Sequence, residues 1–389
     1  MSLRWWQNRE PTVIDPKISC LEAALDVTQA QVQLHRAIPQ LYRVTAATLV
    51  RHKLGRRALV KYHVETAAGP LTLLGKIRAK GTDRTSYQVQ QALWQTGWDA
   101  DSGDGISIPE PLGLVPDWHM ALQRQVPGVS ATQLLATDQG MALVERIAAL
   151  AHKLHRTPVP TPKTHTLADE LSILHDRLPL VAEQYPQWAA RIEDILTACE
   201  MAAAPFLDPG AKAAGPKANV HSGDSPSLHH PTPPVPPTGI HRDFYADQVL
   251  VDGDRLWLVD LDLYCQGSPA VDIGNFIAHI TEQSLRELGS AAAMGDRAAL
   301  LQQTYGALFC SQHFPAHLAQ AQPLEATNWC FAAHHLNWEI ELYTVLTLVR
   351  HIHISTRIAS RQPYTEKLLV LCETRLATRL GGVPGGQGQ

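Results

Sequence analysis

The stretch HRDFYADQVLVDGDRLWLVDLDLY, residues 241–264, decides how the rest of the sequence is interpreted. It contains a strand-like run, QVLV, then Asp-Gly-Asp, then a second strand-like run, RLWLV. An Asp-Gly pair between two apolar runs is a strong local signal for a β-hairpin. Acidic residues flank both runs, so the sequence predicts a strand pair with carboxylates near its ends.

The acidic residues at the end of this hairpin need a partner. Asp260 and Asp262 follow an apolar run, and because side chains alternate along a strand, we expect both to lie on one face together with Leu256 and Leu258. A carboxylate buried there without a partner would cost several kcal/mol in lost solvation. The pattern therefore indicates a nearby cation or metal ion.

The residues around the hairpin include the parts that phosphoryl transfer requires. These parts are an Asp that accepts the proton of a hydroxyl, an amide and an Asp that hold Mg²⁺, and a strand lysine for the phosphates. The candidates are Asp243, Gln248, Asp260 and Lys76. A Gln oxygen is the same hard ligand as an Asn oxygen on a side chain one methylene longer, so Gln248 is compatible with Mg²⁺.

Composition narrows the class of partner. The chain has 389 residues, of which 45% are hydrophobic and 18% charged, so it is long enough for two lobes. Its net charge of -4 and its pI of about 6.5 provide no broad basic field for nucleic acid or a membrane surface. We expect a small-molecule or nucleotide ligand, no nucleic acid and no membrane.

Cysteine usage and the N-terminal residues predict a cytoplasmic protein. The six cysteines form no CxxC pair and no dense framework. The first residues contain no apolar core of a signal peptide, and no uncharged apolar run approaches the roughly 20 residues that span a bilayer. The sequence carries no signal for an oligomeric state.

The first third of the chain has the pattern of a sheet. The runs at 58–64 and 71–78 are rich in β-formers and are joined by a Gly-Pro turn, which predicts a hairpin. We expect a helix at 84–96 and a further strand at 120–126. Together they predict a small antiparallel sheet with one helix.

The rest of the chain has a helical period. Apolar residues in 140–157 recur at helical spacing, whereas a Pro- and Gly-rich segment shows no periodicity. We expect an α+β chain with a first lobe at 1–125 and a mainly helical lobe at 126–389. A disordered insert is expected at 208–238.

Several motifs resemble a known family. HRDFYADQ followed by LWLVDLD resembles the catalytic segment of the protein-kinase-like fold, and the later GSPAVDIGNF resembles the aminoglycoside phosphotransferase family of small-molecule kinases, with some likeness to its maltokinase branch. Weaker similarity in LLGKIR, LQRQVPG and LAHKLH extends the resemblance over roughly residues 45 to 285. It implies a bilobal fold with a small antiparallel β-sheet N-lobe, which would bind the nucleotide, and a larger, mainly α-helical C-lobe, which would carry the catalytic loop and the acceptor site.

The resemblance implies roles for the residues around the hairpin. Asp243 would be the catalytic base, and His241 and Arg242 would hold its loop. The implied ligands of Mg²⁺ are Gln248, Asp260 and, as the second carboxylate, Asp262. Asp260 would be the principal ligand, because its distance from Asp243 suits that role better than the distance of Asp262 does.

It also implies a nucleotide site in the first lobe. Lys76 would pair with the α- and β-phosphates, and backbone groups near Gln125 and Val126 would meet the base. No GxGxxG precedes the first hairpin, so the candidate phosphate loop is RHKLGRR, with Gly55 and Arg57. A basic surface turn is the alternative for this loop.

These features predict an enzyme. We expect an ATP- and Mg²⁺-dependent phosphotransferase that acts on a hydroxyl of a small molecule, a sugar or an amino sugar, with GTP as the alternative donor. The helix after Lys76 contains no glutamate to hold that lysine. The alternative is therefore a nucleotide-binding pseudokinase that regulates or scaffolds a partner.

Two further predictions concern the helical lobe. Asp272 has the pattern of a first-turn helix acid behind Ser268 and Pro269, so we expect it to have a structural role. Residues 281–389 contain no acidic cluster, and Asn337, Trp338 and Glu341 lie at helical spacing, which would suit a neutral sugar or polyol. The alternative is that Trp338 is a core residue.

Overall fold

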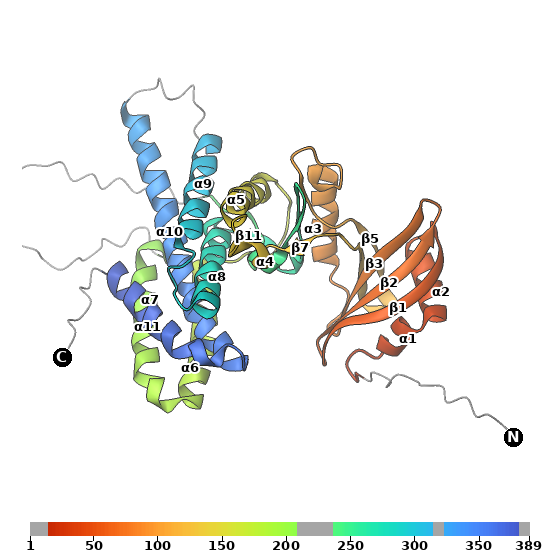
Figure 1. Cartoon of the computed structure of the whole chain (residues 1–389), viewed down its shortest axis with the longest axis horizontal. Helices are drawn as coiled ribbons and strands as arrows, with labels where there is room; N and C mark the ends of the chain where they lie inside the picture. The colour runs from red at the N-terminus through yellow and green to blue at the C-terminus, as the bar shows by residue number, and fades with distance from the viewer. Residues whose placement is uncertain (1–14, 208–235, 314–322, 381–389) are drawn as a thin grey trace, which may run out of the picture. The chain divides into compact units, whose positions relative to one another are not determined.

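The computed structural model of the protein describes residues 15–207, 236–313 and 323–380 (Figure 1). The insert expected at 208–238 lies, up to residue 235, outside the described residues. The chain forms two compact units. Unit 1 comprises Met1–Val129 and Leu250–Asp262, and unit 2 comprises Ser130–Val249 and Leu263–Gln389.

Unit 1 contains a five-stranded antiparallel sheet with the strand order β1-β2-β3-β6-β5. The strands are β1 (Leu41–Lys53), β2 (Arg57–Thr66), β3 (Gly69–Arg78), β5 (Pro111–Val115) and β6 (Met120–Arg124). The predicted hairpin is confirmed as β2 and β3, and the predicted strand at 120–126 as β6.

The helices of unit 1 are α1 (Leu21–Leu25), α2 (Val27–Ala37) and α3 (Arg84–Leu93). Apolar residues of α1 and α2 pack with residues of the sheet into one core, which includes Leu34 and Tyr62. The predicted helix at 84–96 is confirmed as α3. Its regular part stops at Leu93 because the following turn contains Gly97 with a φ of 86°.

A smaller sheet contains the hairpin that the sequence predicts. Its strands in order are β4 (Ile106–Ser107), β10 (Arg255–Leu258), β9 (Val249–Asp252) and β7 (Val129–Ser130), and Gly253 in the turn has a φ of 55°. The expectation that Asp260 and Asp262 continue the alternation of β10 is wrong. The strand ends at Leu258, Asp260 has a φ of 62°, and Asp262 lies in a short 3₁₀ turn.

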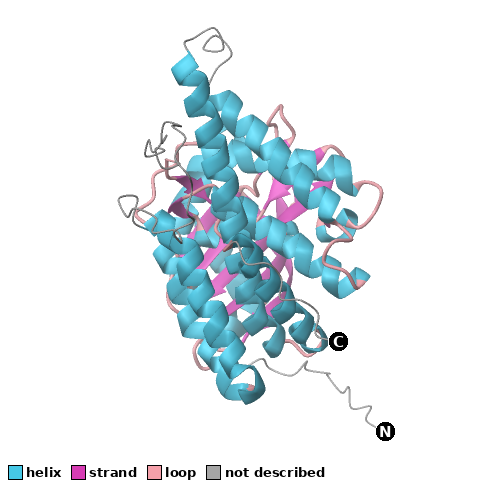
Figure 2. Ribbon diagram, turned by 90° about the vertical axis from the view of Figure 1, so that its left-hand side faces the viewer, coloured by secondary structure: helices cyan, strands magenta, loops and turns pink. Residues whose placement is uncertain are grey.

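Unit 2 consists mainly of helices, which Figure 2 shows in cyan. The longer ones are α5 (Gly140–Arg156), α6 (Leu167–Gln184), α7 (Ala189–Leu207), α8 (Ala270–Leu288), α9 (Gly295–His313), α10 (Pro323–Arg357) and α11 (Thr365–Arg379). The predicted apolar stripe of α5 is confirmed, since its leucines and isoleucine are buried.

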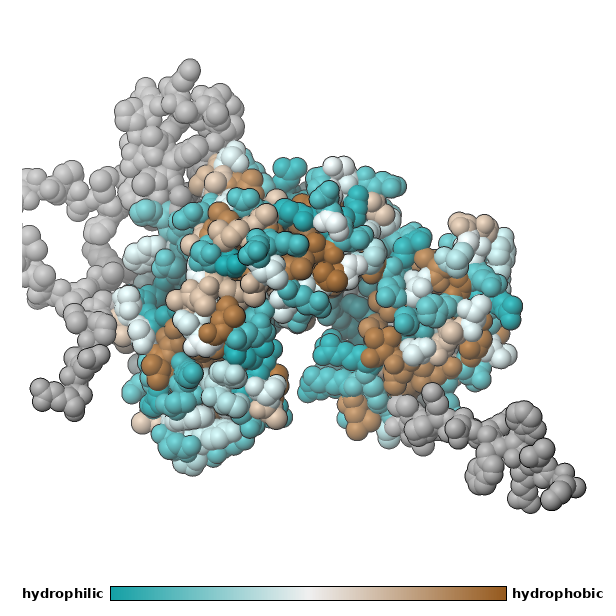
Figure 3. Space-filling model, in the orientation of Figure 1, coloured by the Kyte–Doolittle hydropathy of each residue, from teal (hydrophilic) through white to brown (hydrophobic). Residues whose placement is uncertain are grey.

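The short elements that remain are α4 (Thr132–Leu135), the antiparallel pair β8 (Thr238–Ile240) and β11 (Cys265–Gly267), and 3₁₀ turns at Pro116–Trp118, Pro186–Trp188, Ala246–Gln248, Leu261–Leu263 and Gln362–Tyr364. The pairing of β8 with β11 matters for function, because β8 leads directly into residues 241–248. No helix in the described ranges is long and apolar enough to cross a membrane. On the face drawn in Figure 3, hydrophilic residues are interspersed with hydrophobic ones in both units.

Candidate active site

Lys76 and Asp260 form an ion pair in unit 1. Lys76 lies on β3, and its Nζ donates to Asp260 Oδ1 at 3.0 Å and lies 3.5 Å from Asp262 Oδ1. Strand alternation places Lys76 on this side of the sheet, because its neighbour Ile77 is buried in the core on the other side. The lysine and both predicted carboxylates therefore come together.

Arg78 pairs with Asp262, so the two carboxylates have different surroundings. Its guanidinium lies 2.5 Å from Asp262 Oδ2 and 3.1 Å from Asp83, and the main-chain oxygen of Asp262 accepts from Ser86 of α3. Asp262 is thus neutralised by an arginine and tied to α3. Asp260 has a 30% exposed side chain and pairs with a lysine, so it is the more available of the two for a metal ion.

Asp260 gives Lys76 an acidic partner, which α3 cannot supply because it contains no glutamate. Burial alone would lower the pKa of Lys76, but the negative charges of Asp262 and Asp260 outweigh it and raise the pKa above its ordinary value. Lys76 therefore stays positively charged at neutral pH. Asp260 holds the lysine where the sequence offered no helix glutamate.

Two small pockets of unit 1 adjoin this ion pair. One has a volume of about 30 Å³ and extends toward Gln90 and Gln123, and the other has a volume of about 90 Å³ and extends toward Arg51 and Arg57. Lys76, Arg78, Asp260 and Asp262 line both pockets. The lining thus combines cationic side chains, which can pair with phosphate oxygens, with carboxylates, which can bind a metal ion.

The other predicted nucleotide-binding residues differ in their placement. Arg57 lines the second pocket, whereas Gly55, with a φ of 66°, donates its N–H to Asp15 at 2.8 Å. Gln125 donates its N–H to the Thr72 carbonyl, and neither it nor Val126 is among the described residues that line the two pockets. The roles of Gly55, Gln125 and Val126 stay predictions.

Asp243 lies in unit 2, in the loop that follows β8. Gln248 Nε2 is 3.5 Å from Asp243 Oδ2, and within the described ranges it is the only side chain that hydrogen-bonds this carboxylate. The side chain of Asp243 is half-buried, while Gln248 is buried. With its NH₂ group turned toward Asp243, Gln248 has its carbonyl oxygen available as a ligand.

Asp272 anchors the backbone of this loop. Its two carboxylate oxygens accept the main-chain N–H groups of His241 and Arg242, each at 2.7 Å, and its side chain is fully buried at the start of α8. Arg242 has a φ of 70°, a conformation that residues with a side chain rarely adopt and that needs such support. The prediction that Asp272 is a first-turn acid of α8 with a structural role is confirmed, whereas the predicted Ser268 cap is wrong, because Pro269 occupies the cap position.

A histidine and a tyrosine hold Asp272. His155 Nε2 donates to Asp272 Oδ2 at 2.9 Å, and His155 Nδ1 lies 2.7 Å from the Tyr305 hydroxyl. Burial raises the pKa of Tyr305 well above its ordinary value, so the hydroxyl stays protonated beside Nδ1. The chain Tyr305–His155–Asp272 thus ends on the backbone N–H groups of His241 and Arg242.

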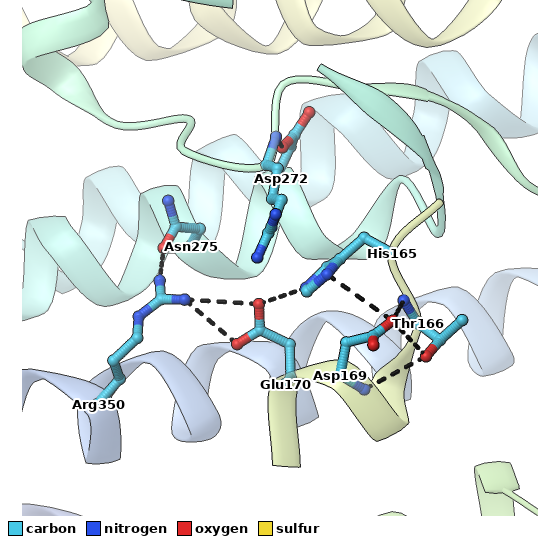
Figure 4. Close-up of polar contacts among 8 residues, drawn as sticks. His165, Thr166, Asp169, Glu170, Asp272, Asn275 and Arg350 are labelled. Atoms are coloured by element: carbon cyan, nitrogen blue, oxygen red, sulfur yellow. Dashed lines mark hydrogen bonds and ion pairs between the residues drawn. The ribbon is translucent and has the colours of Figure 1, made fainter. Parts of the chain in front are cut away.

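A second buried network supports the loop from α6, α8 and α10 (Figure 4). Asn275 donates to the Phe244 carbonyl at 3.0 Å and accepts from Arg350 at 2.8 Å. Arg350 also pairs with the buried Glu170 at 3.2 Å, and His165 donates to Glu170 at 2.7 Å. Burial alone would raise the pKa of Glu170, but the His165 hydrogen bond and the charge of Arg350 lower it.

Further contacts fix the rest of the loop. The Tyr245 ring stacks on His279 of α8 with centroids 4.3 Å apart, and Asp247 accepts the hydroxyls of Ser130 and Thr132 at 2.8 and 2.6 Å. Nearly every residue around Asp243 is therefore held by hydrogen bonds or ring contacts, whereas Asp243 itself has one weak partner. This is the arrangement expected of a preorganised reactive group.

The residues present fit a Mg²⁺ ion on chemical grounds. Asp260 offers a partly exposed carboxylate and Gln248 an amide oxygen, and both are hard oxygen ligands. No group of three or more His, Cys, Asp or Glu side chains that could hold a metal ion occurs within the described residues. Mg²⁺ is commonly bound by one or two carboxylates together with phosphate and water, so a single carboxylate such as Asp260 can serve as its protein ligand without such a group.

Sequence reasoning missed several residues of both units. Arg78 carries a local signal, since it lies two positions after Lys76 on the same strand face. Arg51 lies in the quoted segment RHKLGRR but was given no role, and the strand β1 that carries it was not predicted. His155 and Asn275 lie within quoted motifs but were given no role, and three further residues that support the loop in unit 2 carry no local signal: Glu170, Tyr305 and Arg350.

The chain is similar to a known protein family in sequence and to known kinases in structure. The model of a family described as the phosphotransferase enzyme family matches residues 53–308. A search of curated proteins found no match. The structure is similar to the choline kinase of Cryptosporidium parvum Iowa II (11% identity, 92% of this chain and 97% of the other, TM-score 0.54) and to a choline/ethanolamine kinase family protein of Mesorhizobium loti (15%, 91% and 97%, TM-score 0.50).

A third structure in the comparison is the streptomycin-ATP-APH(2")-IIa ternary complex, with 12% identity, 88% and 95% coverage and a TM-score of 0.47. The predicted family and fold class are confirmed, whereas the likeness to maltokinases stays a prediction. Because the family match covers most of the chain, this protein belongs to the phosphotransferase enzyme family and is a small-molecule phosphotransferase with a protein-kinase-like fold.

Proposed function

We propose that the protein transfers the γ-phosphoryl group of ATP to a hydroxyl of a small molecule, with Asp243 as the catalytic base. The observation that carries the proposal is the contrast within residues 241–248. The backbone around Asp243 is held by Asp272 and Asn275, while the Asp243 carboxylate has only the Gln248 amide as a hydrogen-bonding partner in the described chain. A carboxylate placed in this way can accept a hydroxyl proton and orient the attacking oxygen.

The residues of unit 1 supply the nucleotide half of the proposal. Lys76, kept charged by its acidic neighbours, would pair with the phosphates, and Arg57 lines the adjoining pocket. Asp260 and Gln248 would hold Mg²⁺, which when bound neutralises charge on the β- and γ-phosphates. Lys76 would then exchange its contact with Asp260 for one with phosphate oxygen. Asp262 keeps Arg78 as its partner and has the smaller share in metal binding.

The proposed acceptor is a sugar or an amino sugar, and the proposed donor is ATP, with GTP as the alternative. A direct test incubates the protein with γ-labelled ATP, Mg²⁺ and a cell extract, and then searches for a labelled metabolite. A labelled phosphate ester that forms with wild type and not with Asp243→Asn supports the proposal. Tight Mg·ATP binding without any labelled product would instead support the nucleotide-binding pseudokinase.

A panel of purified acceptors then identifies the class of acceptor that the protein phosphorylates fastest. Neutral sugars, amino sugars, kanamycin-like aminoglycosides and choline are compared at equal concentration. We expect sugars to be turned over ahead of polycationic aminoglycosides and choline, since the described part of residues 281–389 contains no acidic cluster that would attract a polycation. Preferential turnover of the cationic acceptors would contradict the acceptor class and leave phosphoryl transfer itself supported.

A further inference from the structure

An open groove of about 590 Å³ lies within unit 2. It is lined by residues of α8, α9, α10 and α11, which pack against one another. Its apolar part comes from Ile277, Ala298 and Val345. None of the residues 241–248 lines it, so the groove is separate from the loop that carries Asp243.

Trp338 forms an exposed ring on the wall of this groove. Its surface is 59% exposed, so the alternative that it is a core residue is wrong. The guanidinium of Arg379 lies 5.8 Å from the ring centroid, and Arg379 also donates to the Trp338 carbonyl at 2.8 Å. The ring is therefore held in place while much of its surface remains open, as in a platform for a flat ligand.

Arg375 adds a positive charge on which Glu341 acts through its charge, without a direct ion pair. It lines the groove, is partly buried, and forms no hydrogen bond or ion pair with another residue in the part of the chain that the structure describes. Burial lowers the pKa of Arg375, which reflects the cost of holding a charge there. The acid on the groove wall is Glu341, which lies 3.5 Å from Arg379 and is 61% exposed. Two guanidinium groups against one carboxylate leave the groove with one excess positive charge.

The structure also separates residues that the sequence grouped together. Asn337 accepts from Gln302 at 3.3 Å and lines a neighbouring hollow, not this groove. Trp338 and Glu341 line the groove together with Arg375 and Arg379. The aromatic platform and the acid expected for a sugar are thus present, but the surroundings are cationic, so a neutral ligand would leave Arg375 unpaired.

We propose that this groove binds a sugar ring that carries one anionic group, a carboxylate or a phosphate. The apolar face of the ring would lie on Trp338, ring hydroxyls would donate to Glu341, and the anionic group would pair with Arg375. The same excess charge disfavours amino sugars and other cations. The proposal is tested by measuring binding alone. Its outcome does not depend on whether the protein transfers a phosphoryl group to the same molecule.

The test is isothermal titration calorimetry with four matched probes in the absence of ATP: glucuronate, glucose 6-phosphate, glucose and glucosamine. We expect at least one anionic probe to bind at least tenfold more tightly than glucose, and glucosamine to bind most weakly. Tighter glucuronate binding assigns a carboxylate, and tighter glucose 6-phosphate binding assigns a phosphate. Equal affinity for all four probes, or no binding of either anion, overturns the proposal.

Variants test whether the probes bind in this groove. Arg375→Gln should abolish the preference for the anion, and Trp338→Ala, at an exposed position, should weaken every probe that wild type binds. Arg357→Gln, an exposed arginine of α10 that does not line the groove, is the matched control and should bind as wild type does. Unfolding curves establish that each variant is folded. If Arg375→Gln unfolds, Trp338→Ala decides, and anion binding unchanged in Trp338→Ala overturns the proposal.

Discussion

Replacing Asp272 by asparagine should damage the catalytic loop without touching a residue that contacts substrate. Asp272 accepts three short hydrogen bonds at full burial, two from the main-chain N–H groups of His241 and Arg242 and one from His155. Asparagine has the same shape but one acceptor oxygen and one NH₂ group. At least one of the two buried backbone N–H groups would then face a donor.

The size of the effect follows from these contacts. A buried donor left without an acceptor costs about 1–3 kcal/mol, and a hydrogen bond to a charged group contributes about 1.5–3 kcal/mol. We therefore expect Asp272→Asn to lower the free energy of unfolding by about 2–4 kcal/mol. The damaged loop also displaces Asp243 and so raises the activation free energy of the reaction. An increase of about 1.4 kcal/mol lowers turnover about tenfold.

Urea unfolding followed by circular dichroism measures the stability, and the initial rate of phosphoryl transfer measures turnover. Asp296→Asn is the matched control, because Asp296 is a first-turn helix acid that is 56% exposed and pairs with its neighbour Arg297. It should change stability by no more than about 0.5 kcal/mol. The reasoning is refuted if Asp272→Asn resembles this control in both stability and turnover.

Three further outcomes are expected. Asp243→Asn should leave the Kd for Mg·ATP near that of wild type and lower turnover by about 10²–10⁴-fold, because base catalysis is lost while phosphate contacts remain; comparable turnover would exclude Asp243 from the mechanism. Asp260→Ala should abolish Mg²⁺-dependent nucleotide binding in calorimetry whereas Asp262→Ala, which loses a carboxylate already paired with arginine, weakens it less; the reverse order would make Asp262 the principal ligand. Burial lowers the pKa of His351 to about 3, so near pH 6.5 the unfolded chain takes up a proton at this residue and the folded chain does not. The stability that the neutral His351 contributes is therefore fully present above pH 6.5. Below that pH the free energy of unfolding falls by about 1.4 kcal/mol for each pH unit, until pH 3. His351→Gln should flatten that decline in urea titrations between pH 7 and 4, and a decline as steep as that of wild type would contradict it.

The parts of the fold that local sequence determines were predictable. The hairpin of β9 and β10 follows from an Asp-Gly turn between apolar runs, and α5 follows from its apolar stripe. Strand β1 was missed because β-bulges interrupt its register with β2 at three places, which breaks the alternation that a period of two requires. The side-chain direction of Asp260 was predicted wrongly because its positive φ ends the strand geometry before it.

The candidate site was predictable only where its residues are close in sequence or follow a motif. Lys76 and Asp260 could be named as separate candidates, but their ion pair joins residues 184 positions apart, and no pattern in one sequence reports such a contact. The same holds for His155 with Asp272, which are 117 positions apart. Asp272 could be predicted as a structural acid in the first turn of α8, but this position does not reveal that its carboxylate accepts the backbone N–H groups of His241 and Arg242.

The central claim is that Asp243 makes this chain a phosphotransferase that acts on a small-molecule hydroxyl. It is tested most directly by ³¹P nuclear magnetic resonance of a reaction that contains ATP, Mg²⁺ and the best acceptor of the panel. The account predicts that wild type converts the γ-phosphate into a phosphate monoester resonance in step with ADP formation, and that Asp243→Asn binds Mg·ATP yet forms this ester at least a hundredfold more slowly. Ester formation at the wild-type rate in Asp243→Asn, or release of inorganic phosphate alone whatever the acceptor, would contradict it.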